Sequence, residues 1–390
     1  MADEPLEVLG TKTPLEVANK PGMARLAKQG EVGLTCMVPE GMAPGSDTAN
    51  LSVMGYDPKI YYTGRSPLEA LSIGVDMEPT DVSLRCNIVT LSEEEACYEE
   101  RHVIDHSSSE ISTEDAAVLL EALKEGLQRD GYEFYVGTSY RHLFVWKNGK
   151  VVELTPPHDI LTQRIGDYLP QDAVLRDMMK KSYDILVNHP INIKRKEMGL
   201  NPANSAWLWG AGTRPALQSF AEKTGKRGVM ISAVDLLKGI AVGSGMDNII
   251  VEGANGGLHT NYTGKMQAAA DALLKDNYDF VYIHVEAPDE MGHQGLVKEK
   301  VQAIENIDKF IVEPLIEQMN ASGEEYRILI LPDHPTPIRI RTHSNGPIPY
   351  LLYDSTKQLG NFAAYNETVG NISGIVRKDG YQLIDELFNN

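Results

Sequence analysis

The residues best suited to chemistry lie in the segment YIHVEAPDEMGHQG, residues 282–295. Asp289 and His293 stand four positions apart, soon after an apolar run that we expect to form a buried strand. A carboxylate and an imidazole at the point where a buried strand meets a loop are what a divalent-metal site in an α/β protein requires. A single Asp-x-x-x-His pair also occurs as an ordinary surface pair, so this segment alone does not decide between the two.

A second segment, YRILILPDHPTP (326–337), repeats the pattern. Asp333 and His334 directly follow its apolar run, and His343 lies further on in a polar stretch. Together the two segments supply imidazoles and carboxylates from two expected strand ends and one loop, which predicts two neighbouring divalent metal ions. A donor set without cysteine suits Mn²⁺, Zn²⁺ or Mg²⁺, and its histidines favour Mn²⁺ or Zn²⁺.

A serine with a suitable setting for phosphoryl transfer lies in the loop PEGMAPGSDTANLSVMGYD. Proline and glycine make a tight approach to Ser46, and an apparent helix then runs through Met54. A serine at a helix start is commonly only an N-cap. The alternative is a nucleophile whose phosphorylated form the helix N-terminus would stabilise. The spacing P-G-S-D-T lacks the second glycine of a G-x-S-x-G elbow, so it does not indicate a hydrolase triad. Because two metal ions can activate a hydroxyl and neutralise a phosphoryl group, the combination indicates phosphoryl transfer.

The elements that must position these residues fall into two groups. Outside the middle of the chain, apolar runs and helical periodicity predict further core strands at 32–38, 227–233 and 248–252, and helices at 14–28, 265–274 and 297–319. In the middle, the pattern predicts a capped helix from 111 to about 128 and strands at 83–91, 100–105, 132–137, 140–146 and 151–154, the last two joined by the turn K-N-G-K. We therefore predict an α/β core formed by residues 1–75 and 185–390, interrupted by an inserted α+β domain of residues 76–184.

Composition limits the partners of the chain. Its 390 residues, 42% of them hydrophobic, can bury a large core. A formal charge of -19 argues against nucleic acid or an anionic membrane as partner, but a few cations in one cleft would still bind a phosphorylated metabolite. Cys36, Cys86 and Cys97 lack C-x-x-C spacing and are expected to be reduced thiols. With no signal peptide and no apolar run of membrane-spanning length, we expect a soluble cytoplasmic protein. The oligomeric state is not predicted.

Long motifs also occur in a fixed order along the chain. They are GSDTANLSVMGYDP, YTGRSPLEALSIGVD, EISTEDA, YRHLFVW, TPPHDIL, NPANSAWLWG, SAVDLLKGIA, EAPDEMGHQG and LPDHPTP. This series resembles the archaeal-type phosphoglycerate mutases that work without 2,3-bisphosphoglycerate, a family of the alkaline phosphatase superfamily. The resemblance implies an alkaline-phosphatase-like α/β core with a smaller inserted domain, and a phosphoserine at Ser46. By the family pattern, Asp289, His293 and His343 bind one metal ion. Asp333, His334, Ser46 and an Asp from the first core strand bind the other.

The last of these ligands has no counterpart in this sequence. Family members begin with a short apolar strand that ends in Asp-Gly, just ahead of the Met-Ala-Asp that opens this chain. Either Met1 is an internal start, or the protein lacks a core strand and a metal ligand. Asp3 could replace that ligand only by rearrangement. Without it, we expect the metal ion on the Ser46 side to be bound more weakly.

The resemblance also implies a reaction. Ser46 would take the phosphoryl group from 3-phosphoglycerate and return it to the other hydroxyl of the glycerate, which gives 2-phosphoglycerate. The inserted domain would act as a lid, because water in the cavity would hydrolyse the phosphoserine. The substrate carboxylate and phosphate need polar and cationic partners, and the candidates are Arg141, His142, His158, Asp159 and Lys238. Arg141 could equally be a solvated strand residue, and Lys238 a helix-end charge.

Three other interpretations fit part of the sequence. A subgroup of the same resemblance is proposed to phosphorylate homoserine, although the loop sequence S-D-T-A-N favours the mutases. A simple metallophosphatase would share the core and the serine, but it would need no inserted domain that retains glycerate. A metal-stabilised binding protein would explain the metal ligands but not Ser46 in its tight loop.

Overall fold

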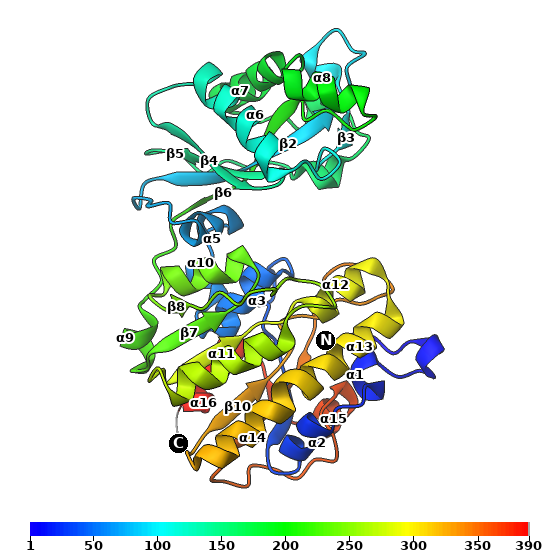
Figure 1. The fold of residues 1–390 in the computed structure, drawn as a ribbon, viewed down its shortest axis with the longest axis vertical. Helices are drawn as coiled ribbons and strands as arrows, with labels where there is room; N and C mark the ends of the chain where they lie inside the picture. Colours follow the sequence, from blue (N-terminus) through cyan, green and yellow to red (C-terminus); the bar gives the residue numbers. More distant parts are fainter. Residues whose placement is uncertain (389–390) are drawn as a thin grey trace. The chain divides into compact units, whose positions relative to one another are not determined.

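The computed structural model describes residues 1–388, which form two compact units (Figure 1). Unit 1 contains Met1–Tyr62 and the chain from Leu217 onward, and unit 2 is Thr63–Ala216. Unit 2 therefore begins before residue 76 and ends after residue 184, the bounds expected for the inserted domain. The difference arises because a helix near residue 70 and a strand near residue 210 both pack on the sheet of unit 2. The described residues contain no helix with the length and hydropathy that a membrane crossing requires.

Unit 2 is built on one antiparallel sheet. Its strands are β2 (Val82–Leu91), β3 (Val103–Asp105), β4 (Tyr132–Thr138), β5 (Arg141–Trp146) and β6 (Ser205–Thr213). Its α-helices are α5 (Arg65–Ser72), α6 (Thr113–Gly126), α7 (Ala173–Leu186) and α8 (Pro190–Glu197), and its 3₁₀ helices are η2 (Tyr98–Glu100), η3 (Pro157–Ile160) and η4 (Ile165–Asp167). β2 is the central strand, since it pairs with β5 on one side and with β6 on the other.

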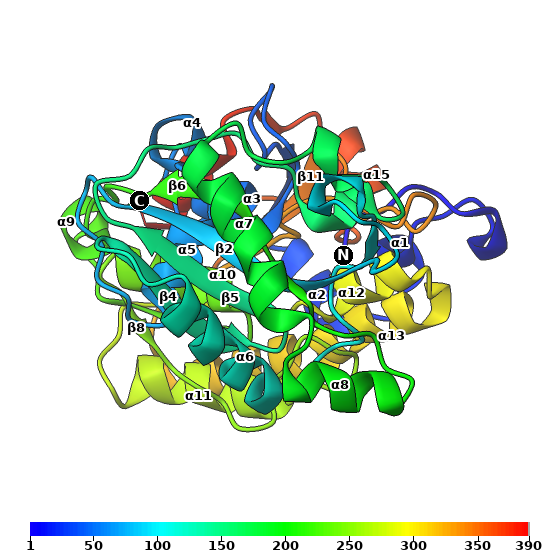
Figure 2. The ribbon, with the colours of Figure 1, turned by 90° about the horizontal axis from the view of Figure 1, so that it is seen from above.

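The core of unit 2 lies between this sheet and two helices. α6 and α7 cross one face of the sheet (Figure 2), and their apolar side chains pack with those of β2 in one buried cluster. Every residue of β2 is buried, as expected for a strand that has neighbours on both edges and helices on its face. Ser112 begins α6 as an N-cap, because its hydroxyl accepts a hydrogen bond from the backbone N–H of Asp115.

Unit 1 contains the remaining elements. Its strands are β1 (Glu31–Thr35), β7 (Gly228–Ile231), β8 (Asp247–Asn248), β9 (Phe280–Ile283), β10 (Arg327–Ile330), β11 (Ile348–Asp354) and β12 (Val376–Arg377). Its α-helices are α1 (Pro14–Val17), α2 (Pro21–Ala27), α3 (Ser46–Val53), α4 (Pro58–Tyr61), α9 (Phe220–Thr224), α10 (Asp235–Gly243), α11 (Tyr262–Leu274), α12 (Ala287–Gln294), α13 (Val297–Ile307), α14 (Glu313–Ser322), α15 (Glu367–Ile372) and α16 (Leu383–Phe388). Short helices η1 (Glu7–Leu9), η5 (Asp308–Val312, a π-helix) and η6 (Gly380–Gln382) complete it.

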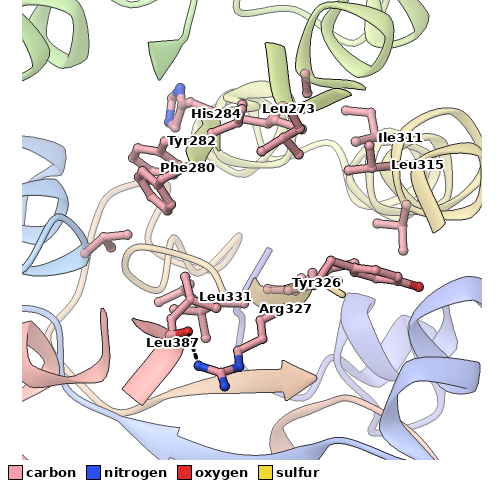
Figure 3. Close-up of a pocket in the computed structure, with 18 of the residues that line it drawn as sticks. Leu273, Phe280, Tyr282, His284, Ile311, Leu315, Tyr326, Arg327, Leu331 and Leu387 are labelled. Carbon is pink, nitrogen blue, oxygen red and sulfur yellow. Dashed lines mark hydrogen bonds between the residues drawn. The ribbon is translucent and has the colours of Figure 1, made fainter. Parts of the chain in front are cut away.

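The strands of unit 1 form two separate sheets. One has the order β10-β11-β1-β12 and the other β8-β7-β9. Within residues 1–388, β9 pairs only with β7 and β10 pairs only with β11. A cavity of about 1080 Å³ is lined by the whole length of both strands. We call this cavity the interstrand slot. Figure 3 shows Phe280 and Tyr282 of β9 facing Arg327 of β10 and Leu331 across it.

Several expected elements differ from the structure. Residues 151–154 form no strand, because the chain leaves the sheet after β5 and no partner accepts them. The strand expected at 248–252 is only the two-residue β8, and the helix expected at 14–28 is broken before Pro21, which starts α2. The helix expected at 297–319 is interrupted by the π-turn η5. β6 was not predicted, since its sequence SAWLWGAGT mixes glycine and tryptophan without clear alternation.

Candidate active site

A hydroxyl, a carboxylate and an imidazole meet at the carboxyl end of β10. Ser46 Oγ lies 3.1 Å from His334 Nε2, and His334 Nε2 lies 3.4 Å from Asp333 Oδ2. Asn50 Nδ2 donates to Asp333 Oδ2 at 2.9 Å and to the carbonyl oxygen of Ser46 at 2.8 Å. The hydroxyl of Tyr282 on β9 donates to Asn50 Oδ1 at 2.5 Å. This set, which we call the serine group, joins α3 to the ends of β9 and β10.

A second set of side chains centres on Asp289. His293 Nε2 lies 3.2 Å from one oxygen of its carboxylate, and His343 Nε2 lies 3.5 Å from the other. The two imidazole nitrogens are 3.0 Å apart. The hydroxyl of Thr336 also donates to Asp289. We call Asp289, His293 and His343 the aspartate group. Asp289 and His293 lie on α12, not on a loop as the sequence suggested, and their spacing of four places both on one helix face.

The two groups are in contact. The imidazole rings of His334 and His343 lie 3.9 Å apart between centroids, and Thr336 Oγ1 is 3.3 Å from His334 Nδ1. One ligand atom each from Asp289, His334 and His343 lies within 4.8 Å of the others, a spacing that could hold a metal ion. The structure thus brings together all six residues that the sequence singled out as metal ligands, from three separate parts of the chain.

The electrostatics of the site follow from burial and from these contacts. Burial by itself would raise the pKa of Asp289, but hydrogen bonds from His293 and His343 hold the pKa of this carboxyl far below its usual range. The hydrogen bond to Asp289 raises the pKa of His293 to about 9. Burial lowers the pKa of His334, so this imidazole favours the neutral form that binds metal ions. The proximity of His334 outweighs the burial of Asp333 and lowers the pKa of that carboxyl.

Ser46 is the first residue of α3 and not its N-cap. The N-cap is Gly45, which has an extended backbone, and the Ser46 side chain makes no capping hydrogen bond. The hydroxyl is instead directed to His334. The capping interpretation of this serine is therefore wrong. A group carried by Ser46 would stand at the positive end of the α3 dipole.

Asn50 and Lys265 are candidate functional residues that the sequence analysis missed. Asn50 stands four positions after Ser46 in the motif S-D-T-A-N, a spacing that places both on one face of a helix. That spacing could have indicated its role. Lys265 is buried, and its ammonium donates to the carbonyl oxygen of His284 at 2.7 Å. Burial lowers the pKa of Lys265 to about 8. No motif in the sequence marks it.

The interstrand slot reaches the candidate site. Ser46, Asp289 and Asp333 line it together with Met1 and the two facing strands. Asp3 does not join the site, because its carboxylate is fully buried against Lys300, at 2.7 Å. Lys300 also donates to the carbonyl oxygen of Thr336 at 2.8 Å, so this ion pair fixes the loop after β10.

The predicted substrate-binding residues occupy different settings. Arg141 and Asp159 are exposed in unit 2, and Asp159 Oδ1 lies 3.8 Å from Nε2 of the partly exposed His158. His142 is buried in β5 and its Nδ1 accepts a hydrogen bond from the backbone N–H of Gly137, so it is not available at the surface of unit 2. Burial lowers the pKa of His142 to about 4. Lys238 of unit 1 lies on α10, and its ammonium donates to Asp235 Oδ1 at 3.0 Å.

Comparisons with known proteins agree with the resemblance. The profile of the family described as "2,3-bisphosphoglycerate-independent phosphoglycerate mutase" matches residues 27–192. A protein of that name from Methanosarcina acetivorans is 48% identical over 90% of this chain and 88% of its own length. A "probable" mutase of the same name from Geobacter sulfurreducens is 46% identical over 100% of this chain and 97% of its own length.

A solved structure supports the fold. A protein from Pyrococcus horikoshii with 28% sequence identity superposes with a TM-score of 0.83, over 99% of this chain and 93% of its own. The α/β fold class predicted from the sequence is confirmed by this likeness and by the sheets and helices of the structure.

Proposed function

The chain belongs to the 2,3-bisphosphoglycerate-independent phosphoglycerate mutases, and from this premise we propose that it interconverts 3-phosphoglycerate and 2-phosphoglycerate through a phosphoserine at Ser46. The observation that carries the proposal is the position of the Ser46 hydroxyl. It lies 3.1 Å from His334 and at the carboxyl ends of the two strands that deliver the acidic and histidine side chains. A hydroxyl without such neighbours would be a weak nucleophile at neutral pH.

The donor set fits two divalent metal ions. Histidine nitrogens and carboxylate oxygens converge without cysteine, and two imidazole nitrogens that face each other at 3.0 Å are both directed at the Asp289 carboxylate. Asp289, His293 and His343 would hold one ion, and Asp333, His334 and Ser46 the other. Mn²⁺ is our first candidate, with Mg²⁺ and Zn²⁺ as alternatives. When bound, such ions promote ionisation of a hydroxyl and neutralise the charge of a phosphoryl group.

The residues of this chain then act in sequence. The Ser46 hydroxyl loses its proton and Oγ attacks the phosphorus of 3-phosphoglycerate, the bond from phosphorus to the C3 oxygen breaks, and that oxygen takes up a proton. Asn50 holds the Ser46 carbonyl oxygen and Asp333, so the nucleophile stays aligned with the strand end. The phosphoserine stands at the N-terminus of α3, where backbone N–H groups favour negative charge. The C2 hydroxyl of the retained glycerate next loses its proton and attacks the phosphorus, the bond to Ser46 Oγ breaks, Oγ takes up a proton, and 2-phosphoglycerate forms. The role of unit 2 as a lid stays a prediction.

The proposal is tested with a coupled assay for conversion of 3-phosphoglycerate to 2-phosphoglycerate. Protein treated with a chelator is assayed before and after addition of Mn²⁺, beside Ser46→Ala, both as the 390-residue chain and with an upstream strand ending in Asp-Gly. Turnover that needs Mn²⁺ and Ser46 in either version supports the mutase. Turnover only in the longer version would show that the mutase reaction needs the upstream Asp-Gly strand.

Two alternatives are read from the same samples. Phosphorylation of homoserine without mutase turnover would replace the proposal with the kinase-like activity. Release of inorganic phosphate from 3-phosphoglycerate as the main product would indicate a metallophosphatase instead.

A further inference from the structure

Arg341 contacts the aspartate group, although the proposed mechanism gives it no part. Nδ1 of His293 lies 3.0 Å from the backbone carbonyl oxygen of Arg341. Because a carbonyl oxygen can only accept a hydrogen bond, Nδ1 carries the hydrogen and donates it. The other ring nitrogen, Nε2, faces the Asp289 carboxylate at 3.2 Å. His293 therefore has one nitrogen held by Arg341 and the other directed into the candidate metal site.

The backbone of Arg341 has an unusual conformation. Its φ is 54°, in the left-handed region that residues other than glycine, asparagine and aspartate rarely occupy. The backbone N–H of Arg341 donates to the carbonyl oxygen of Pro337 at 2.9 Å, so Arg341 closes a single turn of the chain. Chains commonly use glycine at the end of such a turn. The carbonyl that meets His293 directly follows this turn, so its direction depends on the left-handed backbone.

Contacts on both sides of Arg341 hold the turn in place. Just before the turn, the carbonyl oxygen of Thr336 accepts a hydrogen bond from the buried ammonium of Lys300 at 2.8 Å. After the turn, the backbone N–H of Ser344 donates to the carbonyl oxygen of Pro335 at 3.1 Å. A strained residue persists only where the surrounding structure maintains it, and such residues are typical of functional sites.

The side chain gives a reason for arginine where glycine would be unstrained. The guanidinium lies so close to Gly295 that a Cβ built on this glycine would stand 2.7 Å from Nε of Arg341. Gly295 is the C-cap of α12, with φ of 74°. The last carbonyl oxygens of a helix carry partial negative charge, so a guanidinium at this end is favourable. Arg341 thus meets α12 at two points, with its carbonyl at His293 and its guanidinium at Gly295.

We propose that Arg341 is a positioning residue for the metal ion of the aspartate group. Its left-handed backbone aims a carbonyl oxygen at His293 Nδ1 and so leaves Nε2 as the nitrogen that binds the ion. The presence of a divalent ion there rests on the proposed function. Histidines that bind metal ions usually donate their second ring nitrogen to an oxygen, which orients the ring and strengthens the ligand nitrogen. The stretch PIRIRTHS gives no sign of this role, because a positive φ at arginine leaves no pattern in the sequence.

The first test changes the backbone preference at position 341 and measures metal affinity. Full-length protein, freed of metal with a chelator, is titrated with Zn²⁺ in a calorimeter. Arg341→Val should weaken the binding of one ion by about tenfold to 100-fold, because a β-branched residue resists the left-handed conformation and the carbonyl leaves His293. Arg341→Gly should bind that ion within about threefold of the parent affinity, since glycine adopts this conformation freely.

Asn277→Val is the matched control for backbone strain. Asn277 is exposed in unit 1 and has φ of 57°, close to that of Arg341, but it belongs to neither the serine group nor the aspartate group. Urea unfolding should show that Asn277→Val and Arg341→Val are destabilised to a similar extent, whereas only Arg341→Val should lose metal affinity. Equal losses of affinity in these two variants would assign the effect to general destabilisation and overturn the proposal.

The second test observes the imidazole itself. In Zn²⁺-loaded protein labelled with ¹⁵N-histidine, the NMR shifts of the two ring nitrogens distinguish the one that carries hydrogen from the one that binds the ion. The His293 signals are identified by their absence in His293→Asn. We expect hydrogen on Nδ1 and Zn²⁺ at Nε2 in the parent protein and in Arg341→Gly, and faster exchange of the Nδ1 hydrogen with water in Arg341→Val. Zn²⁺ at Nδ1 in the parent protein would contradict the proposal. If Arg341→Val does not fold, Arg341→Ala and the parent spectrum still decide the result.

The two proposals fail in different ways. Equal Zn²⁺ affinity in Arg341→Val and the parent protein, or equal losses in Arg341→Val and Arg341→Gly, would refute the role of the Arg341 backbone and leave the proposed function standing. Absence of mutase turnover in a parent protein that binds Zn²⁺ through His293 Nε2 would refute the proposed function and leave the role of Arg341 in place. A parent protein that binds no Zn²⁺ would refute both.

Discussion

β2 of unit 2 and β9 of unit 1 are both apolar strands, but their neighbours differ. β2 pairs on both edges, and all its residues are buried. Among the strands that the structure describes, β9 pairs only with β7, and each of its residues is only partly buried. The residues of β10, across the interstrand slot, are also only partly buried. A strand in the middle of an α/β core is normally buried on both faces. The comparison shows that apolar sequence specifies a strand, whereas its burial depends on what pairs with it.

The two units also differ in where they carry polar and charged side chains. Unit 1 carries its hydroxyl, carboxylates and imidazoles where β9 and β10 end, beside an open cavity. Unit 2 carries a buried guanidinium on a strand with two neighbours. We therefore expect changes in unit 1 to affect turnover and metal binding, and changes in unit 2 to affect stability or substrate affinity.

The largest expected effect is on kcat and follows from a substitution in unit 1. Ser46→Ala should lower kcat of the mutase reaction by at least about 1000-fold, because the nucleophile is removed. Circular dichroism should show an unchanged fold, since His334 is the one hydrogen-bond partner of the Ser46 hydroxyl among the described residues. Ser52→Ala, a buried serine on the same helix, is the control. Retention of more than a tenth of the activity by Ser46→Ala would contradict the assignment.

Core substitutions should distinguish the sheet of unit 2 from the strands of unit 1 that line the interstrand slot. Phe144→Ala removes a fully buried ring of unit 2 and should lower the free energy of unfolding by about 3–5 kcal/mol. Leu329→Ala, on β10 beside the slot, should cost about 1 kcal/mol, because the cavity already exists. Urea unfolding measures both. The three tryptophans all lie in unit 2, so their emission follows that unit, and circular dichroism follows both. Equal losses of unfolding free energy in Phe144→Ala and Leu329→Ala would refute this difference between the two units.

Removal of one metal ligand should reduce both metal content and rate. His343→Asn is expected to lose at least one bound ion and about 100-fold of the activity, since His343 belongs to the aspartate group and its ring also lies 3.9 Å from that of His334 in the serine group. Metal analysis after dialysis and the coupled assay provide the readouts. The control is His259→Gln, at an exposed histidine, which should keep the metal content and the activity of the parent protein. Full metal content in His343→Asn would exclude it as a ligand.

The smallest effect concerns the loop of His106. Hydrogen bonds from Asn201, Ser107 and Ser109 outweigh the burial of Asp105 and lower its pKa to about 2. Because this pKa is depressed in the folded state, the stabilisation is present above pH 4 and is lost as the pH falls toward 2. After allowance for partial exposure, Asp105→Asn should cost about 1 kcal/mol at pH 7. Urea unfolding should show the difference from the parent protein shrinking below pH 4; a constant difference would refute the linkage.

The sequence could predict the reactive side chains because strand ends impose a regular placement. Asp289, Asp333 and His334 follow apolar runs, and the ends of neighbouring strands meet at one edge of the core. The sequence could not show that Asp289 and His293 lie on a helix, because only local turn geometry separates a loop from α12 there. It did not predict β6 either, and the bounds of unit 2 were therefore set too narrowly.

Residues that act through distant contacts gave no local signal. The contact between the Arg85 guanidinium and the ring of Trp209, more than a hundred positions later, is visible only in the structure. The hydrogen bond from the Lys265 ammonium to the carbonyl oxygen of His284, just after β9, is likewise visible only in the structure. Asn50 is a partial exception, because its spacing from Ser46 was visible in the sequence and accounts for its hydrogen bond to the Ser46 carbonyl oxygen. Its contact with Asp333 is visible only in the structure.

The most direct test of the central claim is to trap the phosphorylated protein. Mn²⁺-loaded full-length protein, mixed with 3-phosphoglycerate and quenched in acid after a few milliseconds, is digested and analysed by mass spectrometry. We expect a phosphate on the peptide that contains Ser46, and none on that peptide in Ser46→Ala. Mutase turnover without phosphate on Ser46 at any quench time, or with phosphate on another residue, would contradict it.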